Sequence, residues 1–382
     1  MILGIESSCD DTSVALLDIT DDHIEILAEK TASQIDVHKK YGGVVPEIAG
    51  RKHAEKIIPL VEYILEEVKV TKPDVIAVTS GPGLITGLVV GVETAKTLSY
   101  LWNVPIVSVN HIEGHIHSVL IGQQSTDYRL QTKQKMGSVV RSPLSVDFPT
   151  LSLIASGGHT ELILSKEQGA YEKLGGTVDD AAGECFDKAA KLLGFDYPGG
   201  PKISQYAETG NPHAIEFPRP MINSKDFNFS FAGLKTSALY WLRDNKLSAM
   251  NVIPYKLPTG VYGQMQEPPT INDFCASFEQ AIVDVLVTKT LTAVKKYKPK
   301  TVTLGGGVSA NVKLRNTLVE AIKHHSPLCT FYFPLSTYCM DNAAMIAVAG
   351  YHRAKNKKFT PWDKLEADPN WKIYNPHPSS KL

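Results

Sequence analysis

The chain repeats one strand pattern in its two halves, and this repetition constrains the fold more than any other feature. Two apolar runs around a polar turn occupy residues 3–17 (LGIESSCDDTSVALL), and the same form returns at residues 152–164 (SLIASGGHTELIL). Each half later has an apolar run followed by glycines and a helical pattern, at residues 75–83 and 302–307. Strands that alternate with helices indicate α/β architecture. The sequence therefore predicts two similar mixed α/β lobes that face each other across a cleft.

Helical periodicity fills the sequence between these strands. Apolar residues recur at helical spacing from residue 46 to 68, and we expect further helices over residues 86–100, 183–193, 273–296, 311–324 and 342–355. Polar composition without periodicity at residues 122–147 predicts a surface insertion, and four prolines at residues 251–269 predict another loop. The expected domains are a first lobe of residues 1–121 plus 342–382, the insertion at 122–147, and a second lobe of residues 148–341.

Composition excludes several classes of protein. With 382 residues the chain is long enough for two lobes with their own cores. Its 39 Lys and Arg residues are balanced by 40 Asp and Glu residues, so a nucleic-acid contact would have to be a local basic patch. Five cysteines without a C-x-x-C pair indicate free thiols in a reducing compartment. No apolar run approaches the roughly 20 residues of a membrane span, so we expect no membrane partner.

Three glycine-rich loops follow short apolar runs, at residues 80–83 (SGPG), 156–159 (SGGH) and 305–309 (GGGVS). Glycine after a strand lets the backbone turn tightly and point several N–H groups at an anion such as phosphate. We expect residues 156–158 and 305–307 to face each other across the cleft with an adenine nucleotide between them.

Two histidines, His111 and His115, are one helical turn apart in the segment HIEGH. Such imidazoles share one helix face, with about 5–6 Å between their Cβ atoms, and can bind one cation. Asp341 precedes an apolar helix and is the candidate third ligand. The alternatives are two packed or capping histidines and a plain N-cap at Asp341. Phosphate loops with a metal pair indicate a metal-assisted nucleotide enzyme.

Carboxylates accompany these loops. Glu6, Asp10 and Asp11 surround the first hairpin turn. Beside a phosphate loop such groups hold a cation or position a nucleophile, because bare carboxylates would repel the phosphate. An ordinary Asp-rich turn is the alternative. Asp187, one turn into a predicted helix, is a candidate acceptor for a ribose hydroxyl.

Basic residues form local groups that usually belong to a solvated face. Here we expect them to line one edge of the cleft and to contact nucleic-acid phosphates. The groups are His38, Lys39 and Lys40, then Arg51, Lys52, His53 and Lys56, and finally Arg129, Lys133, Lys135 and Arg141.

Taken in order, these and further motifs resemble the tRNA threonylcarbamoyladenosine transferase family over nearly the whole chain. The resemblance rests on GIESSCDDT (4–12), YGGVVPE (41–47), SGPG (80–83), HIEGH (111–115), SGGHT (156–160), DK (187–188), YPGGP (197–201), FSFAGLKT (229–236), GGVSAN (306–311) and DNAAM (341–345). It implies the actin, sugar-kinase and Hsp70-like (ASKHA) fold, with a nucleotide cleft between two duplicated lobes.

The resemblance also implies a reaction and its residues. A separate synthase makes threonylcarbamoyl-AMP, whose threonylcarbamoyl group is transferred to N6 of the adenosine 3′ of the anticodon in tRNA, with release of AMP. One divalent metal ion, iron or zinc, is bound by His111, His115 and Asp341. Asp10 and Asp11 are candidates for deprotonating the amine. The adenylate is bound by Ile154, Ala155, Ser156, Gly157, Gly158, Asp187, Gly200 and Asn311.

The chain departs from the family pattern at two places, and the second bears on location. Asp11 stands where the family more often has Glu, and the 122–147 stretch is longer than in compact bacterial members. Motifs such as YPGG resemble the bacterial and organellar branch. We expect a mitochondrial matrix homodimer whose presequence has been removed, with the cytoplasm as the alternative. The final tripeptide, Ser380-Lys381-Leu382, matches a peroxisomal address that also arises by chance.

Other classes of protein stay open at this point. A metal-dependent ATPase or small-molecule kinase shares the implied fold, because fold does not determine function. The interpretation as a metalloprotease is supported only by the histidine pair. HIEGH lacks the glutamate that H-E-x-x-H places directly after the first histidine. A purely structural protein would leave the phosphate-type loops without a role.

Overall fold

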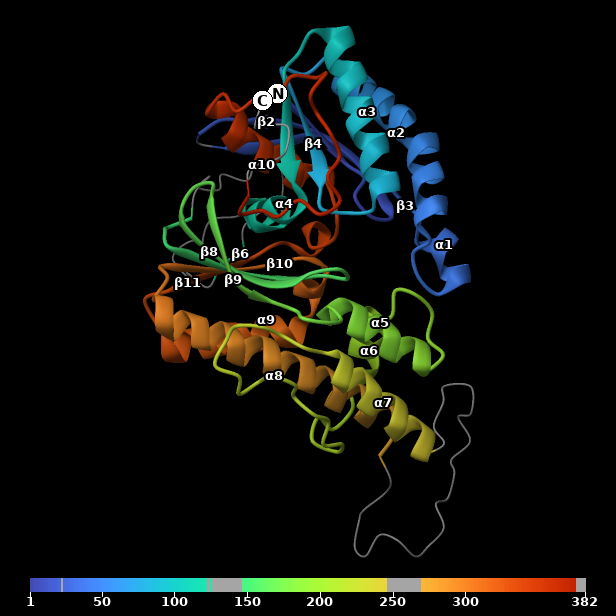
Figure 1. Cartoon of the computed structure of the whole chain (residues 1–382), viewed down its shortest axis with the longest axis vertical. Coiled ribbons are helices and arrows are strands. Elements are labelled where there is room, and N and C mark those ends of the chain that lie inside the picture. Colours follow the sequence, from blue (N-terminus) through green and yellow to red (C-terminus); the bar gives the residue numbers. More distant parts are fainter. Residues whose placement is uncertain (22, 122–123, 126–145, 246–268, 376–382) are drawn as a thin grey trace, which may run out of the picture.

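A computed structural model describes residues 1–21, 23–121, 124–125, 146–245 and 269–375, and it has two lobes, each built on a mixed β-sheet (Figure 1). Most of the predicted insertion at 122–147 and of the predicted loop at 251–269 lies outside the described residues. The C-terminal tripeptide and the basic residues from Arg129 to Arg141 also lie outside them.

The sheet of the first lobe has the strand order β3-β2-β1-β4-β5. Strand β1 is antiparallel to β2 and parallel to β4, and every residue of β1 is buried. Burial on both faces explains why β1 is a continuous apolar run and does not alternate. The strands are β1 (Ile2–Glu6), β2 (Asp11–Ile19), β3 (Ile24–Ser33), β4 (Val75–Gly81) and β5 (Ile106–Asn110).

Helices cover both faces of this first sheet. Leu3 and Ile5 pack with α2 (Pro46–Val68) and α3 (Ile85–Trp102), whereas Ile2 packs on the other face with α10 (Ala343–Lys355). Successive side chains of β1 point to opposite faces of the sheet, so this one strand contributes apolar residues to two separate cores. The C-terminal helix thus joins the first lobe, although its sequence lies more than 200 residues after the other first-lobe elements.

The second sheet repeats the first. Its order is β6-β11-β10-β7-β8-β9, and β7 is antiparallel to β8 and parallel to β10, as β1 is to β2 and β4. The short β6 is an addition at the edge. The predicted duplication is confirmed. The strands are β6 (Gln124–Ser125), β7 (Thr150–Ala155), β8 (Thr160–Glu167), β9 (Ala170–Gly176), β10 (Thr301–Gly305) and β11 (Thr330–Phe333).

Among the described residues five helices belong to the second lobe, and an aromatic core that includes Phe274 and Phe278 packs them on the sheet. In Figure 1, α8 and α9 lie on the side of the sheet away from the first lobe. The predicted helices at 183–193, 273–296 and 311–324 correspond to α5, α8 and α9, whereas α6 and α7 were not expected. The helices are α5 (Ala182–Leu192), α6 (Gly200–Ala207), α7 (Ala232–Asn245), α8 (Ile271–Tyr297) and α9 (Val312–His325). Within the described ranges no helix is both long enough and apolar enough to cross a bilayer.

One short helix, α4 (His111–His117), lies between the two sheets (Figure 1). It contacts α10 of the first lobe and the strands β7 and β10 of the second, and all its residues are buried. A second link between the lobes comes from α1 (Ile35–His38) and the 3₁₀ turn η1 (Lys39–Tyr41), where Lys39 Nζ lies 2.8 Å from Asp196 Oδ2. Further 3₁₀ turns in the described part of the chain are η2 (Ser118–Leu120), η4 (Gly307–Ala310) and η5 (Ser336–Tyr338).

Candidate metal centre and nucleotide site

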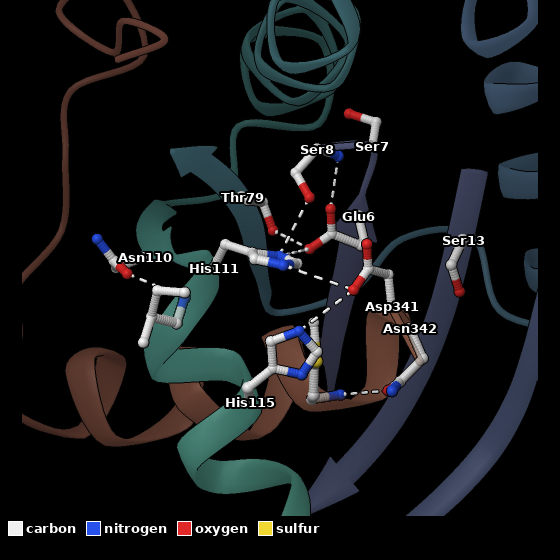
Figure 2. Close-up of polar contacts among 12 residues, drawn as sticks. Glu6, Ser7, Ser8, Ser13, Thr79, Asn110, His111, His115, Asp341 and Asn342 are labelled. Carbon is white, nitrogen blue, oxygen red and sulfur yellow. Dashed lines mark hydrogen bonds and ion pairs between the residues drawn. The ribbon is translucent and has the colours of Figure 1, made fainter. Parts of the chain in front are cut away.

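The structure brings the three predicted metal ligands together at the lobe junction. His111 and His115 lie on α4, and Asp341 lies in the turn before α10 (Figure 2). Asp341 Oδ1 is 3.5 Å from His111 Nε2 and 3.2 Å from His115 Nε2, and one ligand atom from each residue lies within 4.8 Å of the others. Two imidazoles and one carboxylate can therefore reach a single cation.

Helix capping explains how these side chains are placed. The Asn110 side chain accepts a hydrogen bond from Ile112 N (3.0 Å) and starts α4 directly after β5. Asn342 accepts from Met345 N (2.8 Å) and is the N-cap of α10. The alternative that Asp341 is a plain N-cap is therefore wrong, because its neighbour caps the helix. The Asp341 carboxylate faces the histidines instead.

The polar atoms of the cluster fit a cation. His115 is fully buried, and within the described part of the chain neither of its ring nitrogens has a hydrogen-bond partner, although Nε2 lies near Asp341. Buried polar atoms are normally paired, and coordination by a metal would pair this one. Burial opposes ionisation of Asp341, but His111 and His115 outweigh it and hold the pKa of the carboxyl below its usual range.

A buried carboxylate, Glu6 at the end of β1, orients His111. Glu6 Oε2 lies 3.1 Å from His111 Nδ1 and accepts from Thr79 Oγ1 at 2.6 Å, while Oε1 accepts from Ser8 N at 2.6 Å (Figure 2). A carboxylate on one imidazole nitrogen fixes the ring and leaves Nε2 for a metal. Burial lowers the pKa of His111, but Asp341 and Glu6 outweigh burial and raise it to about 9. From sequence, Glu6 was only one of several turn acids. Its position at the end of a wholly apolar run was the available signal.

His159 is a site residue that sequence reasoning did not single out. Its ring lies 6.4 Å from that of His111, between centroids, and burial lowers its pKa to about 3. His159 follows β7, so the position of its ring near His111 shows that the loop after β7 lies beside the candidate metal centre. Membership in the SGGH segment was the signal that could have found it.

The loops at 156–158 and 305–307 do not face each other, which corrects the prediction from sequence. Strand β7 pairs in parallel with β10, with Ile154 opposite Gly305, so both loops leave the same edge of one sheet side by side. Gly306 has φ 87°, and a Cβ there would lie 2.5 Å from Ala155 O. Close approach of the two loops therefore requires glycine at this position.

Gly157 and Gly158 are the open part of this edge. Among the described residues, a Cβ at either position would meet no atom within 4 Å beyond its chain neighbours. Ser156, by contrast, is buried, and its backbone N donates to His159 O at 2.7 Å. Ile154 and Ala155 belong to the buried strand β7. The predicted adenylate contacts in this segment therefore depend on the two open glycines.

The loop at 80–83 is covered by the chain itself. Asp368 N donates to Ser80 O at 2.8 Å, and Gly83 N donates to Pro369 O at 3.3 Å. A Cβ at Gly81 would lie close to the carbonyl of Asp368. These glycines therefore make room for another backbone segment, and the prediction of an open phosphate loop is wrong here.

Gly200 and Asn311 lie at the N-terminal ends of α6 and α9, Asp187 lies in the middle of α5, and all three are engaged with protein groups. Asp187 Oδ1 accepts from Gly199 N (2.7 Å) and Gly200 N (3.2 Å), which holds the turn before α6. Asn311 caps α9 through Leu314 N (2.8 Å) and donates to the buried Glu279 at 2.6 Å. Their predicted nucleotide contacts remain predictions.

Asp10 and Asp11 lie at the turn between β1 and β2. Tyr197 of the second lobe donates from its hydroxyl to Asp10 Oδ2 at 3.3 Å, so this turn bridges the lobes. Burial raises the pKa of Asp11 to about 7, and its Oδ1 has no hydrogen-bond partner among the described residues. A carboxyl that titrates near neutral pH is suited to accepting a proton. The catalytic role of either residue remains a prediction.

The repeated sheets, with a metal-type cluster on the helix between them, define a two-lobed α/β protein of the actin, sugar-kinase and Hsp70-like class. A family model described as tRNA N6-adenosine threonylcarbamoyltransferase matches residues 25–128 and 134–348. The chain belongs to this family, and the resemblance inferred from its motifs is confirmed at this level.

Individual relatives agree with the family match. The protein of Desulfitobacterium hafniense (strain Y51) is 42% identical over 364 residues, which cover 95% of this chain and 94% of the relative. That of Geotalea uraniireducens (strain Rf4) is 43% identical over 375 residues, or 98% and 96%. Both carry the name tRNA N6-adenosine threonylcarbamoyltransferase.

A solved structure supports the fold alone. Full-length HypF, in a phosphate- and nucleotide-bound form, superposes with a TM-score of 0.52 at 12% identity, covering 94% of this chain and 48% of HypF. The predicted fold class is confirmed.

Proposed function

We propose that this chain transfers the threonylcarbamoyl group of threonylcarbamoyl-AMP to N6 of an adenosine in tRNA, at the position 3′ of the anticodon. The observation that carries this proposal is the joint position of the His111, His115 and Asp341 cluster and the open Gly157–Gly158 backbone at one lobe junction, linked through His159. The family to which the chain belongs bears the name of this activity. A separate synthase supplies the donor.

The reaction needs an anion site, a positioned amine and a proton acceptor. The adenosine N6 attacks the carbamoyl carbon, the bond from that carbon to the phosphate oxygen breaks, and AMP leaves with the electron pair. A bound metal ion would polarise the carbonyl or neutralise phosphate charge. Gly157 and Gly158 are exposed, and their N–H groups would receive the AMP phosphate. Asp11, or Asp10, takes the proton that N6 loses.

The test is mass spectrometry of tRNA nucleosides after incubation of the protein with threonylcarbamoyl-AMP and tRNA. We expect N6-threonylcarbamoyladenosine and equimolar AMP, and no product with a tRNA whose target adenosine is replaced by guanosine. Phosphate transfer from ATP to a small alcohol without tRNA modification would favour the kinase alternative. Peptide cleavage that disappears in His111→Ala would favour the protease.

We propose that the bound metal is a single divalent ion, iron or zinc. Two imidazole nitrogens and one carboxylate oxygen form a donor set that both metals accept in proteins, with further positions left for substrate or water. The buried, unpartnered ring nitrogens of His115 among the described residues support this assignment.

We propose that tRNA binds along the edge formed by η1 and the start of α2. Lys39 pairs with Asp196, Arg51 with Glu47 and Lys52 with Glu55, at 2.6–2.8 Å. Within the described residues, no ion pair is formed by Lys40. Exposed pairs of this kind contribute little to stability, so tRNA phosphates can replace the carboxylates.

We propose that the protein is a homodimer. Large apolar side chains are exposed on the adjacent helices α2 and α3, among them Ile58 (43%), Tyr63 (45%) and Val89 (44%). Light scattering after gel filtration should give twice the chain mass, and Val89→Glu should give the monomer mass if these helices form the contact. A wild-type monomer would contradict the proposal.

We propose that the enzyme acts in the mitochondrial matrix, with the cytoplasm as the alternative. The support comes from the sequence: the 122–147 stretch, which is longer than in compact bacterial members, together with motifs that resemble the bacterial and organellar branch. Fluorescent fusions at either end of the protein as its gene encodes it should separate mitochondrial, cytoplasmic and peroxisomal location.

A further inference from the structure

Helix α4 carries two pairs of polar residues on opposite faces. Successive residues turn by about 100°, so Glu113 and His117 lie on the face opposite His111 and His115. Glu113 lines a cavity of about 820 Å³, and none of the three candidate ligands lines that cavity. The second face of α4 therefore belongs to a different environment from the candidate metal centre.

Glu113 is a buried carboxylate tied to both lobes. Its side chain is 3% exposed. Arg353 on α10 donates to Oε2 from Nε at 2.9 Å and from Nη2 at 2.7 Å, and its guanidinium lies over the Trp371 ring. Tyr171 on β9 of the second lobe donates to Oε1 at 3.1 Å. A buried carboxylate is stable only when it is paired and hydrogen-bonded in this way.

A neighbouring contact repeats the link between the lobes. His117 Nδ1 donates to the Glu113 carbonyl at 2.8 Å, which leaves its Nε2 to accept from the Gln168 amide at 2.7 Å. Gln168 follows β8 in the second lobe. The face of α4 away from the ligands is therefore held by three side chains from two lobes: Arg353, Tyr171 and Gln168.

The Glu113–Arg353 pair joins the two elements that supply the candidate ligands. His111 and His115 come from α4, and Asp341 leads directly into α10, which carries Arg353. We infer that Glu113 is a positioning residue, which clamps α4 to α10 and so sets the spacing between the histidines and Asp341. Tyr171 of the second lobe donates to the same carboxylate and so fixes α4 relative to that lobe as well. This inference rests on the proposed metal role of the cluster.

Co²⁺ binding to the full chain without substrates tests the clamp, with titration calorimetry and the visible absorption of bound Co²⁺ as readouts. We expect Glu113→Gln and Arg353→Lys each to lower Co²⁺ affinity by about 10–100-fold and to change the spectrum, as loss of an outer partner does in other metal sites. Tyr171→Phe, which removes one hydrogen bond, should have a smaller effect.

The chain offers a matched control for the ion pair. Arg219 donates to Asp284 Oδ2 from both Nε and Nη2 at 3.0 Å, in the same side-on arrangement but between the second-lobe helix α8 and the segment that connects α6 to α7. Asp284 is more exposed than Glu113, at 33% against 3%, so Arg219→Lys should lose some stability and keep wild-type Co²⁺ affinity. Thermal melts identify variants that fold, and Arg353→Lys decides the question if Glu113→Gln does not fold.

Two failures are distinguishable. If His111→Ala/His115→Ala binds Co²⁺ as the wild type does, the proposed metal site is wrong. If that double variant loses Co²⁺ but folded Glu113→Gln and Arg353→Lys keep wild-type affinity and spectrum, the metal site stands and the positioning role is overturned. An equal loss in Arg219→Lys would also overturn it, because the effect would then be general destabilisation.

Discussion

At the scale of single residues, His111 shows how one side chain is shared between two carboxylates. Its Nδ1 faces Glu6 from β1, and its Nε2 faces Asp341 from the turn before α10. The first carboxylate fixes the ring, and the second is a candidate co-ligand. The cluster therefore depends on three segments that are distant in sequence.

Removal of the imidazoles tests the cluster directly. We expect His111→Ala/His115→Ala to lose stoichiometric metal, because one carboxylate alone cannot hold an iron or zinc ion tightly. Elemental analysis of purified protein measures this, with circular dichroism to show that the fold persists. Unchanged metal content in the double variant would rule out this assignment.

Asp11 predicts a pH dependence of stability. Its folded pKa of about 7 lies above the ordinary value of 3.8, so its contribution to stability is fully present below pH 4 and is lost as the pH rises to 7. Asp11→Asn should therefore stabilise metal-free protein by about 2–4 kcal/mol at pH 8, and by much less at pH 4.5. Urea unfolding at both pH values measures the difference. The same gain at both would contradict the raised pKa.

The same substitution should separate stability from catalysis. If Asp11 accepts the proton from N6, the more stable Asp11→Asn protein makes no modified nucleoside. Full activity in Asp11→Asn would move the proton-accepting role to Asp10.

At the scale of elements, the loop after β7 is the part of the sheet edge that is open to a ligand. Gly158→Val adds a Cβ that has no contact within 4 Å among the described residues beyond its chain neighbours, so the fold should be unaffected while the approach of a phosphate is blocked. Calorimetric titration with AMP should show loss of binding, with an unchanged melting temperature. Gly200→Ala tests a smaller side chain at another predicted adenylate contact, where the added Cβ would make an ordinary 3.7 Å contact with Phe186. The AMP affinity of this variant shows how much one methyl group alone changes binding. Wild-type AMP affinity in Gly158→Val would argue decisively against this loop.

At the scale of the whole molecule, the near-neutral charge means that tRNA binding must use a local patch. We expect Lys39→Ala/Lys40→Ala/Arg51→Ala/Lys52→Ala to bind tRNA more weakly and with a shallower dependence of log affinity on log salt. The slope should fall by about one unit for each phosphate that the variant no longer neutralises. Filter binding over a range of salt measures both quantities, and AMP binding should not change.

A control removes two basic residues elsewhere, in Lys295→Ala/Lys296→Ala at the end of α8. This control should retain the wild-type salt slope. If the quadruple variant also retains the wild-type affinity and slope, tRNA binds elsewhere on the molecule.

Local signals in the sequence were sufficient for the architecture and for the candidate ligands. Apolar runs and helical spacing depend on neighbours along the chain, so both sheets and helices such as α8 could be predicted. The HIEGH spacing places His111 and His115 on one helix face in any fold, and the DNAAM motif singled out Asp341.

Which distant groups meet could be seen only in the folded chain. Parallel pairing of β7 with β10 placed two glycine loops side by side, and the chain near Asp368 filled the loop at 80–83. In the sequence Glu113 is simply an acidic residue between two histidines. Nothing nearby indicates its partner Arg353, which lies 240 residues away. Such contacts depend on how helices and sheets pack, which no local period encodes. Local sequence therefore specifies the parts and their chemistry, whereas packing specifies which of them form the site.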